Sequence, residues 1–355
     1  MESLVNIYKG RRVFVTGHTG FKGSWLCEWL LGLGAEVYGF SNGLPTKPAL
    51  FTQLRLSRRI SRDIRGDVRD TTAVRAAVEA VRPDFVFHLA AQPLVRYSYA
   101  HPLETFDANV MGTAHVLDAC RRLKKKCSLV CVTTDKVYEN NEKGRPFRET
   151  DAFGGYDPYS ASKGACEIVI SSYRRSFFNN PAGNVWVASA RAGNVIGGGD
   201  WAKDRIIPDC FRALAKGEPI PVRNKVSTRP WQHVLEPLSG YLALGAALDA
   251  RADFERVSGG FNFGPNPRDN RTVKEVVEEL LRHAKGSWVD KSDPNAVHEA
   301  GLLSLDIRKA AKVLSWKPTW DFETCIEKVA EWYVDVAAGG DPREITARQI
   351  GEFCS

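Results

Sequence analysis

Tyr159 and Lys163 form the residue pair with the clearest chemical use in this sequence. Their spacing of four residues places both side chains on one face of a helix. A phenol has a pKa of about 10, and a neighbouring ammonium favours its anionic form. Tyr159 could therefore act as a base near neutral pH.

Three more polar residues, Thr134, Asp135 and Lys136, directly follow an apolar run that predicts a strand. They stand at the carboxyl end of that strand, where open α/β sheets bind ligands. Thr134 could hydrogen-bond a reacting oxygen, and Asp135 with Lys136 could give and take protons. Taken alone, the same segment also fits a loop with a surface ion pair.

A loop with the spacing GxxGxxG follows the first predicted strand. Its residues are Gly17, His18, Thr19, Gly20, Phe21, Lys22 and Gly23. In such a loop the first glycine permits a tight turn, the second lets backbone amides approach a pyrophosphate, and the third lets the next helix pack on the sheet. The loop predicts dinucleotide binding, although a structural glycine turn would look alike. An oxidised nicotinamide would further favour the phenolate of Tyr159, and Lys163 could hold the nicotinamide ribose, so the two motifs together predict hydride transfer.

The residues expected at the adenosine end of such a cofactor depart from the usual pattern. An acid usually ends the second strand and binds the ribose of NAD, but Phe40, Ser41 and Asn42 stand there. No arginine stands there for NADP either. Ser41 or Asn42 could hydrogen-bond the ribose. Asp67, after the third strand, could accept from an adenine amino group, or could simply precede the helix that starts at Thr71.

The elements that must position these residues alternate along the first half of the chain. The predicted strands cover 13–15, 37–40, 62–66, 85–89, 129–133 and 185–191. The predicted helices cover 23–32, 71–81, 109–123 and 157–178. This alternation predicts a Rossmann-type, doubly wound parallel sheet in the α/β class.

The second half is more irregular and richer in prolines. Helices are predicted over 273–283, 306–314 and 322–336, and the tail after Gly339 is expected to be peripheral. We expect residues 1–190 to form mainly the NAD-binding domain. Residues 191–355 would form mainly a smaller mixed α/β domain that binds the substrate and is interleaved with the first.

Composition excludes several classes of protein. With 43% hydrophobic and 26% charged residues, the chain is typical of a soluble globular protein. We find neither an apolar stretch that could span a membrane nor a secretory signal, and the eight cysteines form no CxxC pair. We therefore expect a cytoplasmic protein with reduced thiols and no metal site.

The formal net charge of +7 suits anionic ligands. The one dense basic run, 121–126, lies at the end of a predicted helix, where cations are favourable. A nucleic-acid-binding function has only this charge in its favour, so we expect no nucleic-acid partner.

Several longer segments carry a family resemblance. They are Gly17–Leu26, His88–Gln92, Thr134–Tyr138, Asp157–Lys163, Arg191–Trp201 and Ser227–Val234. On these segments the sequence resembles the extended short-chain dehydrogenases/reductases and, among them, the NAD-dependent 4,6-dehydratases of CDP-D-glucose. The resemblance covers residues 10–335.

The resemblance implies a dehydration by internal hydride transfer. Tyr159 would take the proton of the sugar 4-hydroxyl while C4 loses hydride to NAD. Asp135 would help the C6 hydroxyl leave as water, and NADH would return hydride to C6. The product would be CDP-4-keto-6-deoxy-D-glucose, a precursor of 3,6-dideoxyhexoses. Related enzymes carry a glutamate base for C5 where this chain has Lys136, so either Lys136 or another group must serve.

The resemblance also implies binding residues and an assembly. The cofactor site would include Val68, Leu89, Ala90, Ala91, Gln92 and Asn109 beside the glycine loop. The substrate would be held by Asn194, Arg205, Arg229, Arg96 and His298. A homodimer or homotetramer would pack the helices over 109–123 and 158–178 across subunits, without a membrane partner.

Two kinds of alternative remain open. One is another sugar-nucleotide enzyme of the same fold, such as a dTDP-glucose dehydratase or a 4-epimerase. An epimerase does not need the Asp135–Lys136 pair that this chain has. The other is a non-catalytic dinucleotide sensor, which often lacks the tyrosine or lysine that are both present here.

Overall fold

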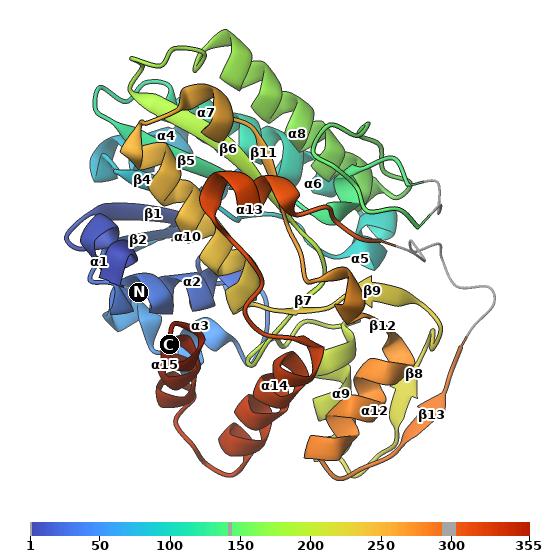
Figure 1. Ribbon diagram of the computed structural model, residues 1–355. Helices are drawn as coiled ribbons and strands as arrows, with labels where there is room; N and C mark the ends of the chain where they lie inside the picture. Colours follow the sequence, from blue (N-terminus) through green and yellow to red (C-terminus); the bar gives the residue numbers. More distant parts are fainter. Residues whose placement is uncertain (1, 141–143, 293–302) are drawn as a thin grey trace.

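Seven short strands, six of them built mainly of buried residues, form one parallel sheet at the centre of the molecule. The computed structural model describes residues 2–140, 144–292 and 303–355, and the sheet order in it is β11-β6-β5-β4-β1-β2-β3. The strands are β1 Arg12–Thr16, β2 Glu36–Ser41, β3 Arg62–Arg65, β4 Phe85–His88, β5 Cys127–Val132, β6 Val185–Ala192 and β11 Gly260–Phe263. All neighbouring pairs are parallel, so each connection crosses over a face of the sheet (Figure 1).

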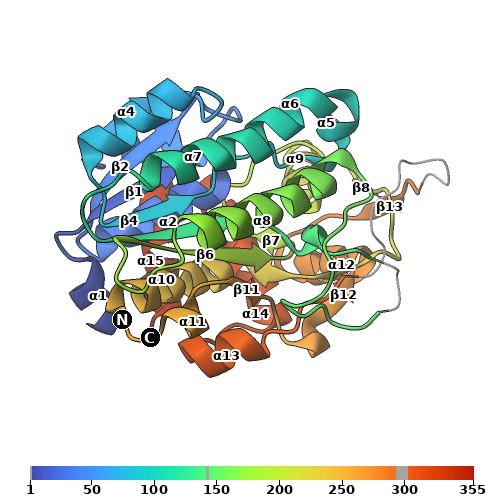
Figure 2. The same cartoon turned by 90° about the horizontal axis from the view of Figure 1, so that it is seen from above.

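Helices cover both faces of the sheet, because successive strand residues point to opposite sides. In β1, Phe14 packs into one apolar core, whereas Val13 and Val15 pack into the other. The first core is covered by α4 Thr71–Val81, α7 Gly112–Cys120 and α8 Pro158–Ser176. The second is covered by α2 Phe21–Gly32 and α10 Leu235–Ala250. Figure 2 shows the two rows of helices on either side of the sheet.

The predicted fold class is therefore confirmed, and the six predicted strands lie within two residues of the observed ones. The sequence patterns did not predict two central elements, β11 and α10. Strand β11 has only four residues, and α10 is buried on nearly all sides, so it lacks the polar face that marks an amphipathic helix. The helix expected over 109–123 is observed as a π-helical turn, η2 Asp107–Met111, that continues directly into α7, and it ends at Cys120.

The second half of the chain adds a layer of short elements at the carboxyl edge of the sheet. Its two-stranded pairs are β7 Val195–Ile196 with β10 Gln232–His233, β9 Thr228–Pro230 with β12 Asn270–Thr272, and β8 Ile220–Val222 with β13 Trp288–Asp290. Its main helices are α9 Ile206–Ala215, α12 Val273–His283 and α14 Phe322–Ala337. The helices predicted over 273–283 and 322–336 match α12 and α14.

The expectation of a peripheral tail after Gly339 is wrong. Helix α15 Pro342–Phe353 packs between α2 and α14 and buries Ile345, Ile350 and Phe353. The ring of Phe353 stands edge-on to Trp29 of α2, with centroids 5.7 Å apart. Helix α15 thus completes the core beneath α2, the helix that follows the glycine loop. In the sequence, only three apolar residues indicate the buried face of α15.

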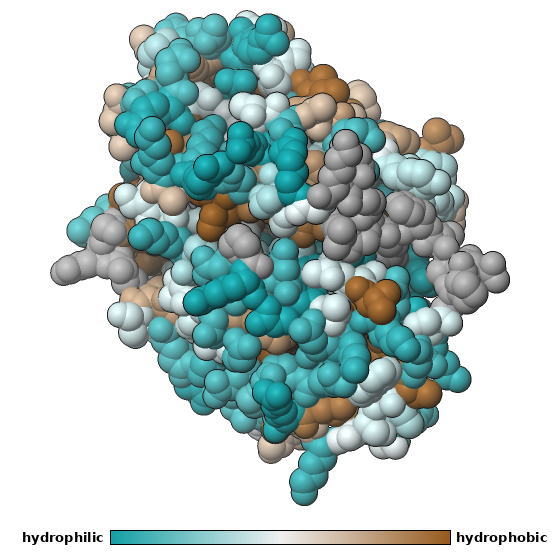
Figure 3. All heavy atoms as spheres, turned by 45° about the vertical axis from the view of Figure 1, so that its right-hand side comes forward, coloured by the Kyte–Doolittle hydropathy of each residue, from teal (hydrophilic) through white to brown (hydrophobic). Residues whose placement is uncertain are grey.

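The remaining short elements connect these layers. They are α1 Glu2–Tyr8, α3 Leu50–Gln53, η1 Leu56–Arg58, α5 Val95–Ala100, α6 Pro102–Phe106, η3 Asp135–Val137, α11 Phe254–Val257, η4 Pro267–Asp269 and α13 Arg308–Leu314. The face in Figure 3 is mainly hydrophilic, with hydrophobic side chains in small separate groups. Within the described ranges, no helix combines the length and apolar character that a membrane span requires.

Candidate active site

Helix α8 positions the Tyr159–Lys163 pair. The helix starts at Asp157, whose carboxylate accepts from the backbone N–H of Ser160 at 2.9 Å, and Pro158 occupies its first turn. Both Tyr159 and Lys163 are almost fully buried. Lys163 Nζ donates to the carbonyl of Val132 at the end of β5, 3.2 Å away. The structure thus ties the pair to the same strand end that carries Thr134, Asp135 and Lys136.

The protonation of Tyr159 depends on its surroundings. Burial raises the pKa of Tyr159 to about 12, while a hydrogen bond with Thr134 and the charge of Arg205 act in the opposite direction. Burial also lowers the pKa of Lys163. Tyr159 is therefore a protonated phenol at neutral pH in this state, and an added positive charge would favour its phenolate.

The loop after β5 brings an acid within electrostatic range of Tyr159 and an amine next to that acid. Asp135 is completely buried, and its Oδ1 accepts from Thr134 Oγ1 at 2.9 Å and from Lys136 Nζ at 3.5 Å. Its other oxygen, Oδ2, is buried and has no hydrogen-bond partner among the described residues. A buried carboxylate oxygen without a partner is costly, so Oδ2 of Asp135 is suited to a ligand.

The glycine loop forms as its spacing predicts. Gly17 has a φ of +72°, and a Cβ on Gly23 would lie 2.2 Å from the Gly17 carbonyl oxygen, so both positions require glycine. Helix α2 then starts without a side-chain cap, which leaves its first N–H groups free of side-chain acceptors. This bare helix start and the absent side chains make a cradle for an anionic pyrophosphate.

Two loop side chains point away from the cradle. The ring of His18 is fully buried between Gly39 and Phe51, with Nε2 2.9 Å from Oδ1 of Asp63. Burial lowers the pKa of His18. Thr19 Oγ1 forms a hydrogen bond of 2.7 Å with Ser41 Oγ. Only the backbone of His18 and Thr19 therefore borders the cradle.

Lys22, by contrast, points toward the candidate catalytic residues. Its Nζ lies 3.4 Å from the hydroxyl of Tyr241, a buried residue of α10 that the sequence patterns missed. Burial, followed by the charges of Arg205 and Lys163, lowers the pKa of Lys22 to about 7. The structure thereby gathers Lys22, Lys163 and Arg205 around Tyr159, a cluster of cations suited to anionic ligands.

A carboxylate stands near the end of β2, although the sequence has none at the usual position. Asp67, after β3, accepts from Asn42 Nδ2 at 3.1 Å and from Arg69 Nη2 at 2.7 Å. The hydrogen bond from Arg69 contributes most to lowering the pKa of Asp67 to about 2. Val68, next to Asp67, is buried against Gly112 of α7.

Asn109 organises the segment after β4 that contains Leu89, Ala90, Ala91 and Gln92. It is fully buried, exchanges hydrogen bonds of 2.8 and 3.1 Å with the backbone of Gln92, and donates to Ser162 of α8 at 2.8 Å. Its side chain therefore holds the segment after β4 against α8. Asn109 lies in the π-helical turn η2, and such turns occur frequently at functional sites.

The predicted substrate residues lie on the second layer. Asn194 follows β6, and its Oδ1 is buried without a partner among the described residues. Arg205 precedes α9, pairs with Asp200 at 2.8 Å, and interacts electrostatically with Tyr159. Arg229 of β9 is buried and donates to the carbonyl of Thr228 at 3.0 Å.

The two other predicted substrate residues are Arg96 and His298. Arg96 is exposed on α5, which packs against α8. His298 lies outside the described residues.

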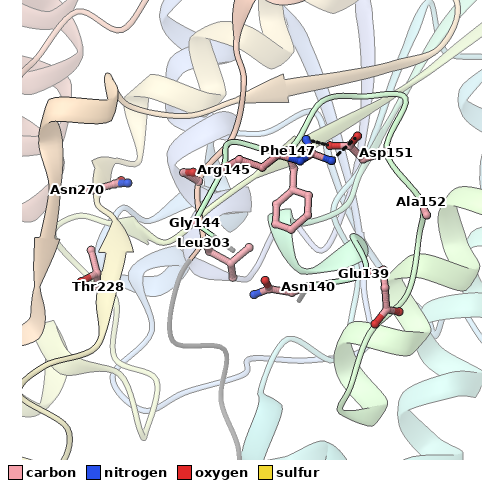
Figure 4. A pocket seen from close by; sticks show the side chains of 11 residues that line it. Glu139, Asn140, Gly144, Arg145, Phe147, Asp151, Ala152, Thr228, Asn270 and Leu303 are labelled. Atoms are coloured by element: carbon pink, nitrogen blue, oxygen red, sulfur yellow. Dashed lines mark hydrogen bonds and ion pairs between the residues drawn. The ribbon is translucent and has the colours of Figure 1, made fainter. Parts of the chain in front are cut away.

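A cavity of about 230 Å³ opens beyond the Thr134–Lys136 segment (Figure 4). Its lining includes Glu139, Thr228 of β9, Asn270 of β12 and the ion pair of Arg145 with Asp151. It thus lies beside the strand that carries Arg229. Among the described residues, no group of three histidine, cysteine, aspartate or glutamate side chains is placed to bind a metal.

Comparisons with known proteins agree with this geometry. Residues 14–329 match the family model described as GDP-mannose 4,6 dehydratase. A CDP-glucose 4,6-dehydratase from Salmonella typhimurium is 45% identical over 99% of this chain and 98% of its own length. A probable dTDP-glucose 4,6-dehydratase from Sinorhizobium fredii is 27% identical over 91% of this chain and 93% of its length.

Two solved structures show the same fold. A dTDP-glucose 4,6-dehydratase from Streptomyces venezuelae, solved with NAD bound, has a TM-score of 0.78 at 23% identity and covers 94% of this chain and 99% of its own. A UDP-glucose 4-epimerase from Thermus thermophilus, also with NAD, has a TM-score of 0.76 at 25% identity, with 91% and 99% covered.

Proposed function

The chain belongs to the GDP-mannose 4,6-dehydratase family, and we propose that it converts CDP-D-glucose to CDP-4-keto-6-deoxy-D-glucose and water. The choice of CDP-D-glucose is supported by the 45% identity, over nearly the whole length, to a CDP-glucose 4,6-dehydratase. One structural observation carries the reaction type. The buried carboxylate of Asp135 is paired with Lys136 and acts electrostatically on the buried Tyr159, and such a dehydration needs a base at O4, an acid at the C6 hydroxyl and a base at C5.

The residues at the glycine loop fit NAD as the cofactor. A Cβ at Gly17 would approach Ala90 to 2.8 Å, so the glycines leave open a cradle that side chains would fill. The backbone of residues 17–23 would hold the pyrophosphate, Ser41, Asn42 and Asp67 the adenosine, and Lys163 the nicotinamide ribose. Bound NAD would accept hydride from C4 of the sugar and later return it to C6.

Tyr159 is the base of the first step in this proposal. It takes the proton of the sugar 4-hydroxyl, while Thr134 hydrogen-bonds the same oxygen. Burial alone opposes the phenolate, so the neighbouring cations, Arg205 first among those acting on Tyr159, must favour it.

Asp135 and Lys136 carry out the elimination as a unit. Transfer of one proton from the Lys136 ammonium to the Asp135 carboxylate yields an amine and a carboxylic acid. The amine takes the C5 proton, and the acid protonates the C6 hydroxyl, which leaves as water, so the ion pair is restored. Lys136 then returns its proton to C5, and the proton held by Tyr159 replaces it through solvent.

The sugar nucleotide would lie between the two layers of the molecule. We assign the cofactor mainly to residues 1–190 and the substrate mainly to residues 191–355. Asn194 offers its Oδ1, which has no partner among the described residues, to the substrate, and Arg205 and Arg229 offer guanidinium groups that match phosphate oxygens.

We further propose a homodimer or homotetramer. The helices expected between subunits, or segments next to them, expose large apolar side chains, namely Leu103 (84% exposed), Met111 (47%) and Ile168 (60%). Exposed apolar groups of this kind favour burial against a partner. From the family resemblance we propose a cytoplasmic enzyme whose product feeds 3,6-dideoxyhexose synthesis for cell-surface polysaccharide such as O-antigen.

Incubation with NAD and CDP-glucose tests the function. We expect an alkali-induced 4-ketosugar chromophore and a product lighter by one water, detected by mass spectrometry. UDP-glucose and dTDP-glucose serve as comparison substrates. Turnover of dTDP-glucose alone would refute the CDP assignment, and NAD binding without turnover of any sugar nucleotide would favour a sensor.

A further inference from the structure

A buried ion pair links α8 to β6 directly beneath the catalytic residues. Glu167 of α8 and Arg191 of β6 are each 3% exposed. They form two parallel hydrogen bonds of 2.9 Å, one from Nε and one from Nη2 of the arginine. A buried pair of charges is costly unless its remaining hydrogen-bonding positions are filled, so the other partners of each residue indicate what the pair does.

The glutamate end of the pair holds the residue in front of Thr134. Glu167 accepts a hydrogen bond from the hydroxyl of Thr133, the last residue before the Thr134–Lys136 segment, and another of 2.7 Å from Ser189 of β6. Although burial by itself would raise the pKa of Glu167, the charge of Arg191 and these hydrogen bonds keep it lowered. Glu167 therefore remains an ionised carboxylate that holds Thr133 in place.

The arginine end holds the residue behind the same segment. Arg191 Nη1 donates to the hydroxyl of Tyr138 at 2.7 Å, two residues after Lys136. Its guanidinium lies 5.3 Å from the ring centroid of Tyr138 and 4.8 Å from that of Phe153. The Tyr138 hydroxyl in turn donates to Oδ1 of Asn262 in β11 at 2.7 Å. The segment is therefore tied to one ion pair at both ends.

The pair also has a fixed relation to Tyr159. Glu167 lies four residues after Lys163 and eight after Tyr159, so all three project from one face of α8. The pair thus connects the helix that carries the proposed base at O4 to the loop that carries the proposed acid and C5 base. No other buried ion pair of the described residues contacts both ends of that loop.

We propose that the Glu167–Arg191 pair positions Asp135 and Lys136 against the sugar that Tyr159 oxidises, and thereby sets the rate of water loss. This role rests on the proposed dehydratase function. Both residues are positioning residues, because they touch Thr133 and Tyr138 and none of the proposed reacting groups. Misplacement of a catalytic group by about 1 Å can cost on the order of a hundredfold in rate.

Four variants test this role. Glu167→Gln keeps the shape of the side chain and removes its charge. Thr133→Val and Tyr138→Phe each cut one end of the link and leave the ion pair in place, so they remain useful if Glu167→Gln folds poorly. Glu28→Gln is the matched control, because Glu28 of α2 is also a buried carboxylate, paired with Arg59.

The readout separates the two half-reactions in single-turnover experiments with CDP-glucose. C4 oxidation is followed by NADH absorbance, and water loss by mass. We expect oxidation within about threefold of the wild type and water loss slowed at least tenfold in Glu167→Gln, Thr133→Val and Tyr138→Phe. Glu28→Gln should change neither the rate of oxidation nor the rate of water loss.

Equal loss of both half-reactions, or lowered thermal stability with an unchanged ratio of the two rates, would overturn the positioning role. Failure of the wild-type enzyme to oxidise CDP-glucose would instead refute the proposed function, so the two failures are distinguishable.

Discussion

The backbone of Gly193 lies directly against the free carboxylate oxygen of Asp135. A Cβ built on Gly193 would stand 3.0 Å from Oδ2 of Asp135 and 2.8 Å from Pro230. Gly193 does not have a positive φ, so space rather than backbone conformation requires glycine here. The absence of a side chain keeps the space next to Oδ2 unfilled on this side.

Gly193→Ala should therefore impair the elimination more than the oxidation. The added methyl group presses on the oxygen that would protonate the leaving hydroxyl, and we expect kcat for dehydration to fall roughly tenfold to a hundredfold. The measurement is product formation, with NADH absorbance as the record of C4 oxidation. Gly245→Ala is the control, since its Cβ would be crowded by Tyr8 at 2.6 Å, away from the proposed active-site residues. Equal effects of both variants would contradict the interpretation.

Thr134→Val should move the acidic limb of the pH–rate profile to higher pH. In the proposed mechanism Tyr159 reacts as a phenolate; burial raises its pKa to about 12, and the hydrogen bond with Thr134 lowers it. Loss of that bond raises the pKa, so less phenolate forms at a given pH, and a shift of one unit would slow oxidation about tenfold at pH 7. Rates of NADH formation between pH 6 and 10 measure the shift. Thr134→Ser should restore the wild-type profile, and an unshifted limb in Thr134→Val would refute the role of the hydrogen bond.

Glu236→Gln should change the pH dependence of stability. Glu236 is buried at the start of α10 and accepts from the backbone N–H groups of Thr319 and Trp320 at 3.1 and 2.7 Å. Burial raises the pKa of Glu236 to about 7 from an ordinary value of 4.5. Its protonated form is favoured by folding, so its contribution is complete below pH 4.5 and is lost as the pH rises to 7.

The stability of the wild type should therefore fall relative to Glu236→Gln by on the order of 3 kcal/mol between pH 4.5 and 8. Urea unfolding at the two pH values measures this difference. Glu218→Gln, at an exposed position, should show no such trend. A difference between Glu236→Gln and the wild type that stays constant with pH would refute the prediction.

Gly198→Ala should destabilise the contact between the two layers. A Cβ there would lie 1.9 Å from Cγ of Trp332, and the Gly198 carbonyl accepts from Trp25 Nε1 of α2 at 3.0 Å. Overpacking of this kind costs about 3 kcal/mol, which urea unfolding would detect. Gly32→Ala, whose Cβ would meet nothing within 4 Å, should leave stability unchanged or raise it. Equal stability of the two variants would contradict the packing argument.

Much of the fold and half of the candidate site follow from the sequence alone. The GxxGxxG loop, the Tyr159–Lys163 spacing and the six strands are local patterns, because turn geometry and helical or strand periodicity act over a few residues. They predicted the sheet, the cradle and the proposed catalytic helix. The same patterns missed α10 and α15, whose burial depends on distant partners.

The tertiary structure alone decided which side chains meet. Strand order places Gly193 against Asp135, joins Glu167 to Thr133, and turns the ring of His18 away from the cradle toward Asp63. These contacts connect residues far apart in the chain, so no spacing in the sequence encodes them. Local sequence thus determined the candidate catalytic groups that this chain carries, and the packing of its layers determined their arrangement, because side-chain contacts between elements form only when the whole sheet is assembled.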